Sequence, residues 1–149
     1  MAWLTYFLIG ALTMLSFAPF GWFPAAFFFV LPLICAFRYC EPGSAARLGF
    51  AWGAGLFFAG TYWLYVSIHI FGQAPPFVAT FMMIALIVIM AIYYAVAGWF
   101  VATLRGQGGW QFVAVMSTTW VFLEWLRGWM LSGFPWMTLG YSQIDSWLA

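Results

Sequence analysis

The sequence predicts an all-α integral membrane protein, a bundle of about five transmembrane helices with interfacial loops on the extracytoplasmic side. Of its 149 residues, 67% are hydrophobic and only 5% are charged, whereas a soluble domain has about 25% charged residues. Residues 84–96 read IALIVIMAIYYAV, without the apolar–polar alternation of a membrane-spanning β-strand. Continuous apolar runs satisfy their backbone groups in lipid as α-helices of about 20 residues.

The first two helices are predicted over residues 3–18 and 24–38. Residues 1–37 carry no charged side chain and are too long for one crossing. Pro19, Gly21 and Pro24 divide this run, because proline begins a helix well and continues one badly. The first residues lack a basic side chain and a small-residue cleavage site, so we expect the first helix to remain as an uncleaved anchor.

A third helix is predicted over residues 46–70. Small residues recur along it at every fourth position, and this spacing lets helix backbones approach closely in lipid. Two adjacent rows of this kind predict a buried helix that contacts several others. The rows are Ala45, Gly49 and Gly53, and Ala51, Gly55 and Ala59.

Two further helices are predicted over residues 77–104 and 110–131. QAPP at 73–76 separates the first from the helix before it, and RGQGG at 105–109 separates the two from each other. From Gly133 onward, turn residues, aromatic residues and Asp145 predict an interfacial loop or re-entrant turn over 133–149. Residues 1–149 therefore form one transmembrane helical domain, with no soluble domain.

The distribution of arginines predicts the orientation. With five crossings, Arg38, Arg47 and Arg105 occupy alternate loops on one side, and only Arg127 departs from this pattern. The positive-inside rule places these loops, and the N-terminus, in the cytoplasm. Three polar islands then gather at the extracytoplasmic face. They are WLYVSIHIFG at 63–72, EWLRG at 124–128 and GFPWMTLGYSQID at 133–145.

No metal site, cofactor site or internal catalytic triad is predicted. Cys35 and Cys40 lie near one helix end on the cytoplasmic side, where we expect free thiols. His69 is the only histidine. The nearest nucleophile, Ser67, lies two residues away and therefore on a different helix face.

Glu124 and Arg127 are three residues apart, so they lie on one helix face and can pair. Counting from Trp110, Glu124 lies about 21 Å into a hydrocarbon core of about 30 Å. Charges at this depth are costly, face the bundle interior and often mark function. Two interpretations remain open. The pair serves packing alone, with Arg127 reaching the headgroups, or it orders the following loop or binds a headgroup phosphate.

Other candidate residues surround this pair at the predicted outer face. His69 is typical of an interfacial hydrogen-bonding residue. Trp129, Pro135, Trp136, Tyr141 and Gln143 combine turn formers with aromatic rings, a pattern typical of membrane anchoring. The sequence contains 11 Trp, more than anchoring requires, and Trp120, Trp125, Trp129 and Trp136 crowd one end. This crowding also fits the lining of an acyl-chain cleft.

The islands together resemble a known family. GALTMLSFAPFGWFPAA, WLYVSIHIFG and EWLRGWMLSGFPWMTLGYSQID, in this order, are similar to the N-terminal membrane portion of apolipoprotein N-acyltransferase over nearly the whole chain. The resemblance implies a multi-pass protein of the bacterial inner membrane. It also implies a phospholipid acyl donor and a lipoprotein acceptor whose N-terminal cysteine is acylated, with no cofactor and no nucleic-acid partner.

The same resemblance implies that the chemistry takes place elsewhere. The family carries its acyl group on a cysteine of a nitrilase-like domain, beside a Glu base and a Lys, in a region beyond Ala149. This chain has no Lys, and Cys35 and Cys40 do not match the family's nucleophile. We therefore expect no catalytic residue on this chain, a fragment that is inactive alone, and a role in anchoring and in lipid and lipoprotein access.

The remaining candidates are lipid-binding, substrate-binding or structural residues: Glu124, Arg127, His69, Trp129, Pro135, Trp136, Tyr141 and Gln143. The alternative interpretation is a non-enzymatic short membrane protein that binds lipid or scaffolds a partner. A transporter is disfavoured, because no half-repeat is visible and Glu124 lies toward one face.

Overall fold

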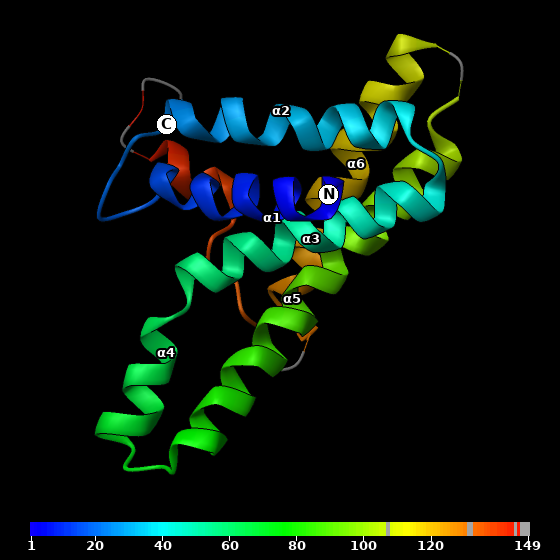
Figure 1. The fold of residues 1–149 in the computed structure, drawn as a ribbon. Helices are drawn as coiled ribbons and strands as arrows, with labels where there is room; N and C mark the ends of the chain where they lie inside the picture. The colour runs from blue at the N-terminus through cyan, green and yellow to red at the C-terminus, as the bar shows by residue number, and fades with distance from the viewer. Residues whose placement is uncertain (107, 131–132, 145, 147–149) are drawn as a thin grey trace.

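The computed structural model describes residues 1–106, 108–130, 133–144 and 146 (Figure 1). These residues form helices and turns without a β-strand, which confirms the all-helical class. The helices are α1 (Ala2–Thr13), α2 (Pro24–Tyr39), α3 (Pro42–Gly60), α4 (Trp63–Val66), α5 (Pro76–Leu104) and α6 (Gly109–Arg127). Single 3₁₀ turns follow α1 and span Leu139–Gln143, and a π-turn, Ser67–Phe71, follows α4.

Helix α3 is the centre of the bundle, packed between α1 and α5. A Cβ atom at Gly55 would lie 1.9 Å from the Phe7 carbonyl oxygen of α1. On another face, a Cβ atom at Gly49 would lie 2.3 Å from the Tyr94 carbonyl oxygen of α5. Both rows of small residues therefore mark backbone-to-backbone contacts, which confirms the prediction of a buried, multiply contacted α3.

The prediction of one continuous helix over residues 46–70 is wrong. Helix α3 begins earlier, at Pro42, and ends at Gly60. The chain then bends by 48° into residues 63–71. At the bend, the Thr61 hydroxyl donates a hydrogen bond to the Phe57 carbonyl at 2.6 Å, a contact that bends helices. Figure 1 shows α4 and the start of α5 extending beyond the α1–α2 hairpin.

Two other helix ends also differ from their predicted positions. Helical turns after α1 end at Ser16 rather than residue 18, because the residue before Pro19 disfavours helical backbone angles. Helix α6 ends at Arg127, although residues 110–131 were expected to be helical; residue 131 itself lies outside the described residues. The chain reverses here, and the Phe134 N–H donates to the Arg127 carbonyl at 3.0 Å.

Gly133 makes this reversal possible. Its φ is +75°, in the region that side chains with a Cβ atom disfavour. A Cβ atom at this position would also lie 2.2 Å from the Gly128 carbonyl oxygen. The glycine therefore returns residues 133–144, which we call the return segment, over the end of α6.

Two arginines join the ends of α2 and α5. Arg105 donates through Nη1 to the carbonyl oxygens of Phe37 at 3.0 Å and Cys40 at 2.6 Å. In the opposite direction, Arg38 donates through Nη1 to the Gly106 carbonyl at 3.4 Å. These reciprocal contacts place two alternate loops at the same end of the bundle, as the predicted topology requires.

One described helix, α5, is long and apolar enough by itself to cross a membrane, with a mean hydropathy of 2.4 in its best window. Helix α3 with residues 63–71 qualifies as a second span if the bent pair counts as one. Helix α1 with its 3₁₀ turn, and α2, are apolar and shorter. The five predicted crossings therefore remain a prediction, as does the orientation.

Candidate functional site

Parts of the three polar islands meet at the end of α6 that is opposite Arg105. The ring centroids of Trp63 and Trp136 are 5.8 Å apart, which joins the first island to the return segment. Arg127 contacts Thr138, which joins the second island to the return segment. The structure therefore brings Trp63 of the first island, the end of α6 and the return segment into one cluster.

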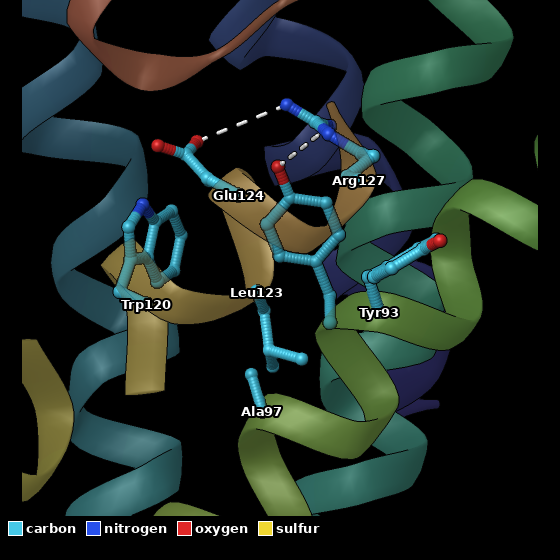
Figure 2. A pocket seen from close by; sticks show the side chains of 7 residues that line it. Tyr93, Ala97, Trp120, Leu123, Glu124 and Arg127 are labelled. Atoms are coloured by element: carbon cyan, nitrogen blue, oxygen red, sulfur yellow. Dashed lines mark hydrogen bonds and ion pairs between the residues drawn. The ribbon is translucent and has the colours of Figure 1, made fainter. Parts of the chain in front are cut away.

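Arg127 is the centre of this cluster and is 1% exposed. Its Nη2 atom lies 3.9 Å from a Glu124 carboxylate oxygen (Figure 2) and donates to the Thr138 hydroxyl at 3.2 Å. Its Nη1 atom donates to the Tyr94 hydroxyl at 3.5 Å. The guanidinium carbon also lies 5.3 Å from the centre of the Phe57 ring, within range of a cation–π contact. Helices α3, α5 and α6 and the return segment thus share one buried cation.

Glu124 holds the return segment at a second point. Its carboxylate accepts a hydrogen bond from the Leu139 N–H at 2.9 Å. Figure 2 shows this carboxylate facing the Arg127 guanidinium, with the Trp120 indole beside it. Because adjacent residues of the return segment bind Arg127 and Glu124, the pair works as a latch on that segment. This geometry favours loop ordering over the binding of a headgroup phosphate by the buried Arg127.

Aromatic rings pack around Tyr94, whose hydroxyl accepts a hydrogen bond from Arg127. The Tyr94 ring lies 5.0 Å from the Trp52 ring and 5.4 Å from the Trp120 ring, both in edge-to-face geometry. Trp52 is fully buried and donates through Nε1 to the Phe29 carbonyl at 3.1 Å. Edge-to-face pairs add about 0.5–1.5 kcal/mol each beyond their buried area. The cluster ties α2, α3, α5 and α6 to the position of the Tyr94 hydroxyl.

The space beside Glu124 and Arg127 is small. The cavity beside Glu124 and Arg127 has a volume of about 10 Å³, which is enough for about one water molecule. Figure 2 shows the Tyr93 hydroxyl directed away from the pair. This cavity is therefore too small to hold a lipid or a peptide beside the latch.

A cleft of about 560 Å³ lies beside it, between the end of α1, the α3–α4 junction and the return segment. We call this space the Met137 cleft. Its volume falls within the range of about 300–1,000 Å³ typical of ligand pockets. Its lining is Met14, Ser16, Phe17, Ala18, Pro19, Gly21, Gly60, Tyr62, Trp63, Trp136, Met137, Tyr141, Ser142 and Ile144.

The structure brings two of the predicted residues, Trp136 and Tyr141, to this cleft. Pro135 contributes its carbonyl, which accepts the Thr138 hydroxyl at 2.7 Å and so helps to position the latch. Gln143 donates through Nε2 to the Phe23 carbonyl at 3.4 Å and lines a neighbouring apolar space of about 290 Å³. These residues belong to the return segment or support it.

Two predicted residues lie apart from the latch. Trp129 is 66% exposed and stacks edge-to-face on Trp125 at 5.0 Å, which is typical of an interfacial anchor. His69 makes a local contact, in which its Nδ1 atom lies 2.8 Å from the Ala74 carbonyl oxygen. Its ring lies 5.4 Å from that of Tyr65. Asp145, expected in the same loop, lies outside the described residues.

Sequence reasoning missed Tyr94, Thr138, Met137 and Gly60. A signal existed for Tyr94, because a phenol inside an otherwise aliphatic run needs a hydrogen-bond partner. Met137 and Gly60 gave no such signal. They meet because the thioether sulfur of Met137 occupies the place of a side chain at Gly60, 1.9 Å from where its Cβ atom would lie.

Residues 9–149 match the apolipoprotein N-acyltransferase N-terminal domain. Among curated relatives, the apolipoprotein N-acyltransferase of Nitrosomonas europaea is 40% identical over 141 residues, covering 94% of this chain and 28% of the relative. That of Vibrio cholerae is 37% identical over 144 residues, with 95% and 28% coverage. That of Pasteurella multocida is 34% identical over 145 residues, with 95% and 27% coverage.

The chain spans less than a third of the length of these relatives. The match nevertheless runs through the turn after α1, α3, α5, α6 and the return segment, the parts that build the latch and the Met137 cleft. By this match, the chain belongs to the apolipoprotein N-acyltransferase family, in the region of its N-terminal domain.

Proposed function

We propose that this chain is the membrane-embedded portion of a lipoprotein N-acyltransferase, which transfers an acyl chain from a phospholipid to the N-terminal cysteine of a lipoprotein. In this role, residues 1–149 anchor the enzyme and present lipid and lipoprotein to a catalytic region that lies elsewhere. The observation that carries the proposal is the latch. A buried Glu124–Arg127 pair fixes an aromatic return segment beside a cleft of ligand size.

The surface of the helices supports a membrane setting. Along α5, large apolar side chains are widely exposed, including Phe77, Phe81, Ile84, Val88 and Ile92. Soluble monomers rarely expose continuous apolar patches of this kind, whereas lipid solvates them at no cost. The bacterial inner membrane, with the N-terminus in the cytoplasm, is the setting we propose.

The positions of the two cysteines support a role in presenting lipid and lipoprotein rather than in covalent acyl transfer. Covalent acyl transfer needs an activated nucleophile with a base in reach. Cys40 belongs to the arginine-linked end of the bundle, where its carbonyl accepts from Arg105, and Cys35 is exposed on α2. Glu124 is committed to the return segment at the other end of α6. The buried Glu124 carboxylate is thus separated from both thiols along the bundle, and Glu41, which is next to Cys40 in the sequence, is exposed.

This separation predicts that the isolated chain forms no acyl-enzyme. We expect no hydroxylamine-sensitive acylation after incubation with phospholipid vesicles, as measured by intact-protein mass spectrometry. The matched control is a double Cys35→Ser, Cys40→Ser variant, which should give the same spectrum. Acylation of the parent that disappears in the control would contradict the assignment of the chemistry to another region.

The arginine distribution predicts the orientation. In a Cys35→Ser, Cys40→Ser background, a cysteine at Gly43 should resist a membrane-impermeant maleimide added outside intact cells. A cysteine at Gln73 should react. Both positions are exposed in the structure, so the difference reports the side of the membrane and not local burial. The reverse pattern would contradict the orientation.

A chimaera tests the function itself. Residues 1–149 would replace the corresponding segment of the Nitrosomonas europaea relative, and the chimaera would be scored for lipoprotein N-acylation in cells depleted of their own enzyme. Restored N-acylation is the expected result, and an Arg127→Gln chimaera should lose it. A chimaera that inserts normally and remains inactive would instead favour the alternative, a non-enzymatic membrane protein that binds lipid or scaffolds a partner.

A further inference from the structure

We infer that the Met137 cleft binds one acyl chain of a bilayer phospholipid, with Met137 and Gly60 forming a floor that limits the length of chain admitted. The inference rests on the proposed function in one respect, that the chain lies in a lipid bilayer. It adds to that function a defined lipid site, its direction and the residues that set its depth.

The lining of the cleft divides into a buried floor and an exposed rim. Phe17, Met137 and Ser142 are 9%, 4% and 5% exposed, and Ser16 is 1% exposed. Gly60 is also buried. The rim, by contrast, is formed by the exposed side chains of Tyr62, Trp63, Trp136, Tyr141 and Ile144. A ligand therefore enters past aromatic rings and ends against a small buried surface.

The floor offers no free hydroxyl proton to a polar ligand. The Ser16 hydroxyl donates to the Thr13 carbonyl at 2.6 Å, and the Ser142 hydroxyl donates to the Leu139 carbonyl at 2.7 Å. Both floor hydroxyl protons are thus used within the protein. The remaining floor is a phenyl ring, a thioether and a glycine backbone, so a hydrocarbon chain end fits it and a polar group does not.

The rim has the chemistry of the boundary between acyl chains and headgroups. Indole and phenol rings prefer this depth because they combine an apolar body with a polar end. Trp63 and Trp136 lie with their centroids 5.8 Å apart at the mouth of the cleft. This arrangement sets the direction of the lipid, with its ester end at the rim and its methyl end at the floor.

The depth of the floor depends on how Met137 is held. Its φ is +57°, a conformation that a non-glycine residue adopts only when its surroundings impose it. The next two residues, Thr138 and Leu139, bind Arg127 and Glu124. The latch therefore holds the Met137 thioether in contact with Gly60. A change of side-chain volume at Met137 or Gly60 should alter the length of the acyl chain that fits.

Photo-crosslinking of the chain in phospholipid nanodiscs tests this inference. Two phosphatidylethanolamine probes would be used, with a diazirine either at the end of a palmitoyl chain or next to its ester. The terminal diazirine should label floor residues such as Phe17 and Met137, and the ester-proximal one should label Trp136 and Tyr141. Labelling of the same residues by both probes would overturn the inference.

Substitutions then test the floor. Gly60→Leu should reduce terminal-probe labelling of Phe17 by at least about tenfold, the lower end of the effect of added methylenes in an apolar pocket. The matched control is Gly140→Leu, because Gly140 lies on the return segment with open space around it. Adding Met137→Ala to Gly60→Leu should restore labelling by returning volume to the floor. Unchanged labelling in Gly60→Leu, or no recovery in the double variant, would overturn the inference.

An internal reference separates the inference from the proposed function. Val88 on α5 is 40% exposed, so surrounding lipid should label it in every variant. Labelling of Val88 without position-dependent labelling of the cleft would overturn the lipid site alone. Absence of label at both places would show that the chain does not lie in the bilayer and would overturn the proposed function as well.

Discussion

Replacing Arg127 with Gln is expected to lower the free energy of unfolding by about 3 kcal/mol, the lower end of the cost of breaking a buried ion pair. The substitution leaves the Glu124 carboxylate without its cation and removes the donors to Tyr94 and Thr138. The lower end applies because the Glu124 side chain is 16% exposed. The measurement is a sodium dodecyl sulfate titration in mixed micelles, followed by tryptophan fluorescence.

Glu124→Gln should cost less than Arg127→Gln, because the glutamine carbonyl still accepts the Leu139 N–H. The loss of unfolding free energy in the double variant should be smaller than the sum of the losses in the two single variants, since each single change leaves the other residue without its partner. Strict additivity would show that the two residues do not interact. Amide exchange at Leu139 supplies an independent readout, which Glu124→Ala should accelerate and Glu124→Gln should largely preserve.

Gly55→Leu is expected to destabilise the bundle by about 3 kcal/mol, the upper end of the usual cost of overpacking. Its Cβ atom would lie 1.9 Å from the Phe7 carbonyl oxygen and 2.9 Å from the Ala11 nitrogen. Both are backbone atoms, so relief requires α1 to move as a unit. The same titration measures the effect.

Gly43→Leu is the matched control, because Gly43 lies on the same helix with nothing near its Cβ position. Its stability should equal or exceed that of the parent, since leucine favours helix more than glycine does. Equal stability of Gly55→Leu and Gly43→Leu would contradict the close contact between Gly55 and the α1 backbone.

The sequence was sufficient to predict the contacts that depend on local spacing. The rows through Gly49 and Gly55 specify which faces of α3 meet other backbones, because only small residues allow that approach. The pairing of Glu124 with Arg127 also follows from spacing, since three residues place both on one face. Pro24 marked the start of α2 correctly, because its ring fits the first helical turn.

Contacts between distant segments escaped prediction. Tyr94 meets Arg127 only because α5 and α6 pack together, and Thr138 reaches it only because Gly133 reverses the chain. Met137 packs over Gly60 only because the same reversal brings its thioether to the end of α3. The residue pattern within a single segment cannot predict these contacts between distant segments.

The arginines that join α2 and α5, Arg38 and Arg105, have two separate roles. Their positive charge predicts the orientation of the chain in the membrane. Their forked guanidinium groups also cap exposed carbonyls, with Arg105 bridging Phe37 and Cys40. A lysine in place of Arg105 would keep the charge and lose the fork. Insertion and assembly would then become separable, with correct insertion followed by a loosened contact between the ends of α2 and α5.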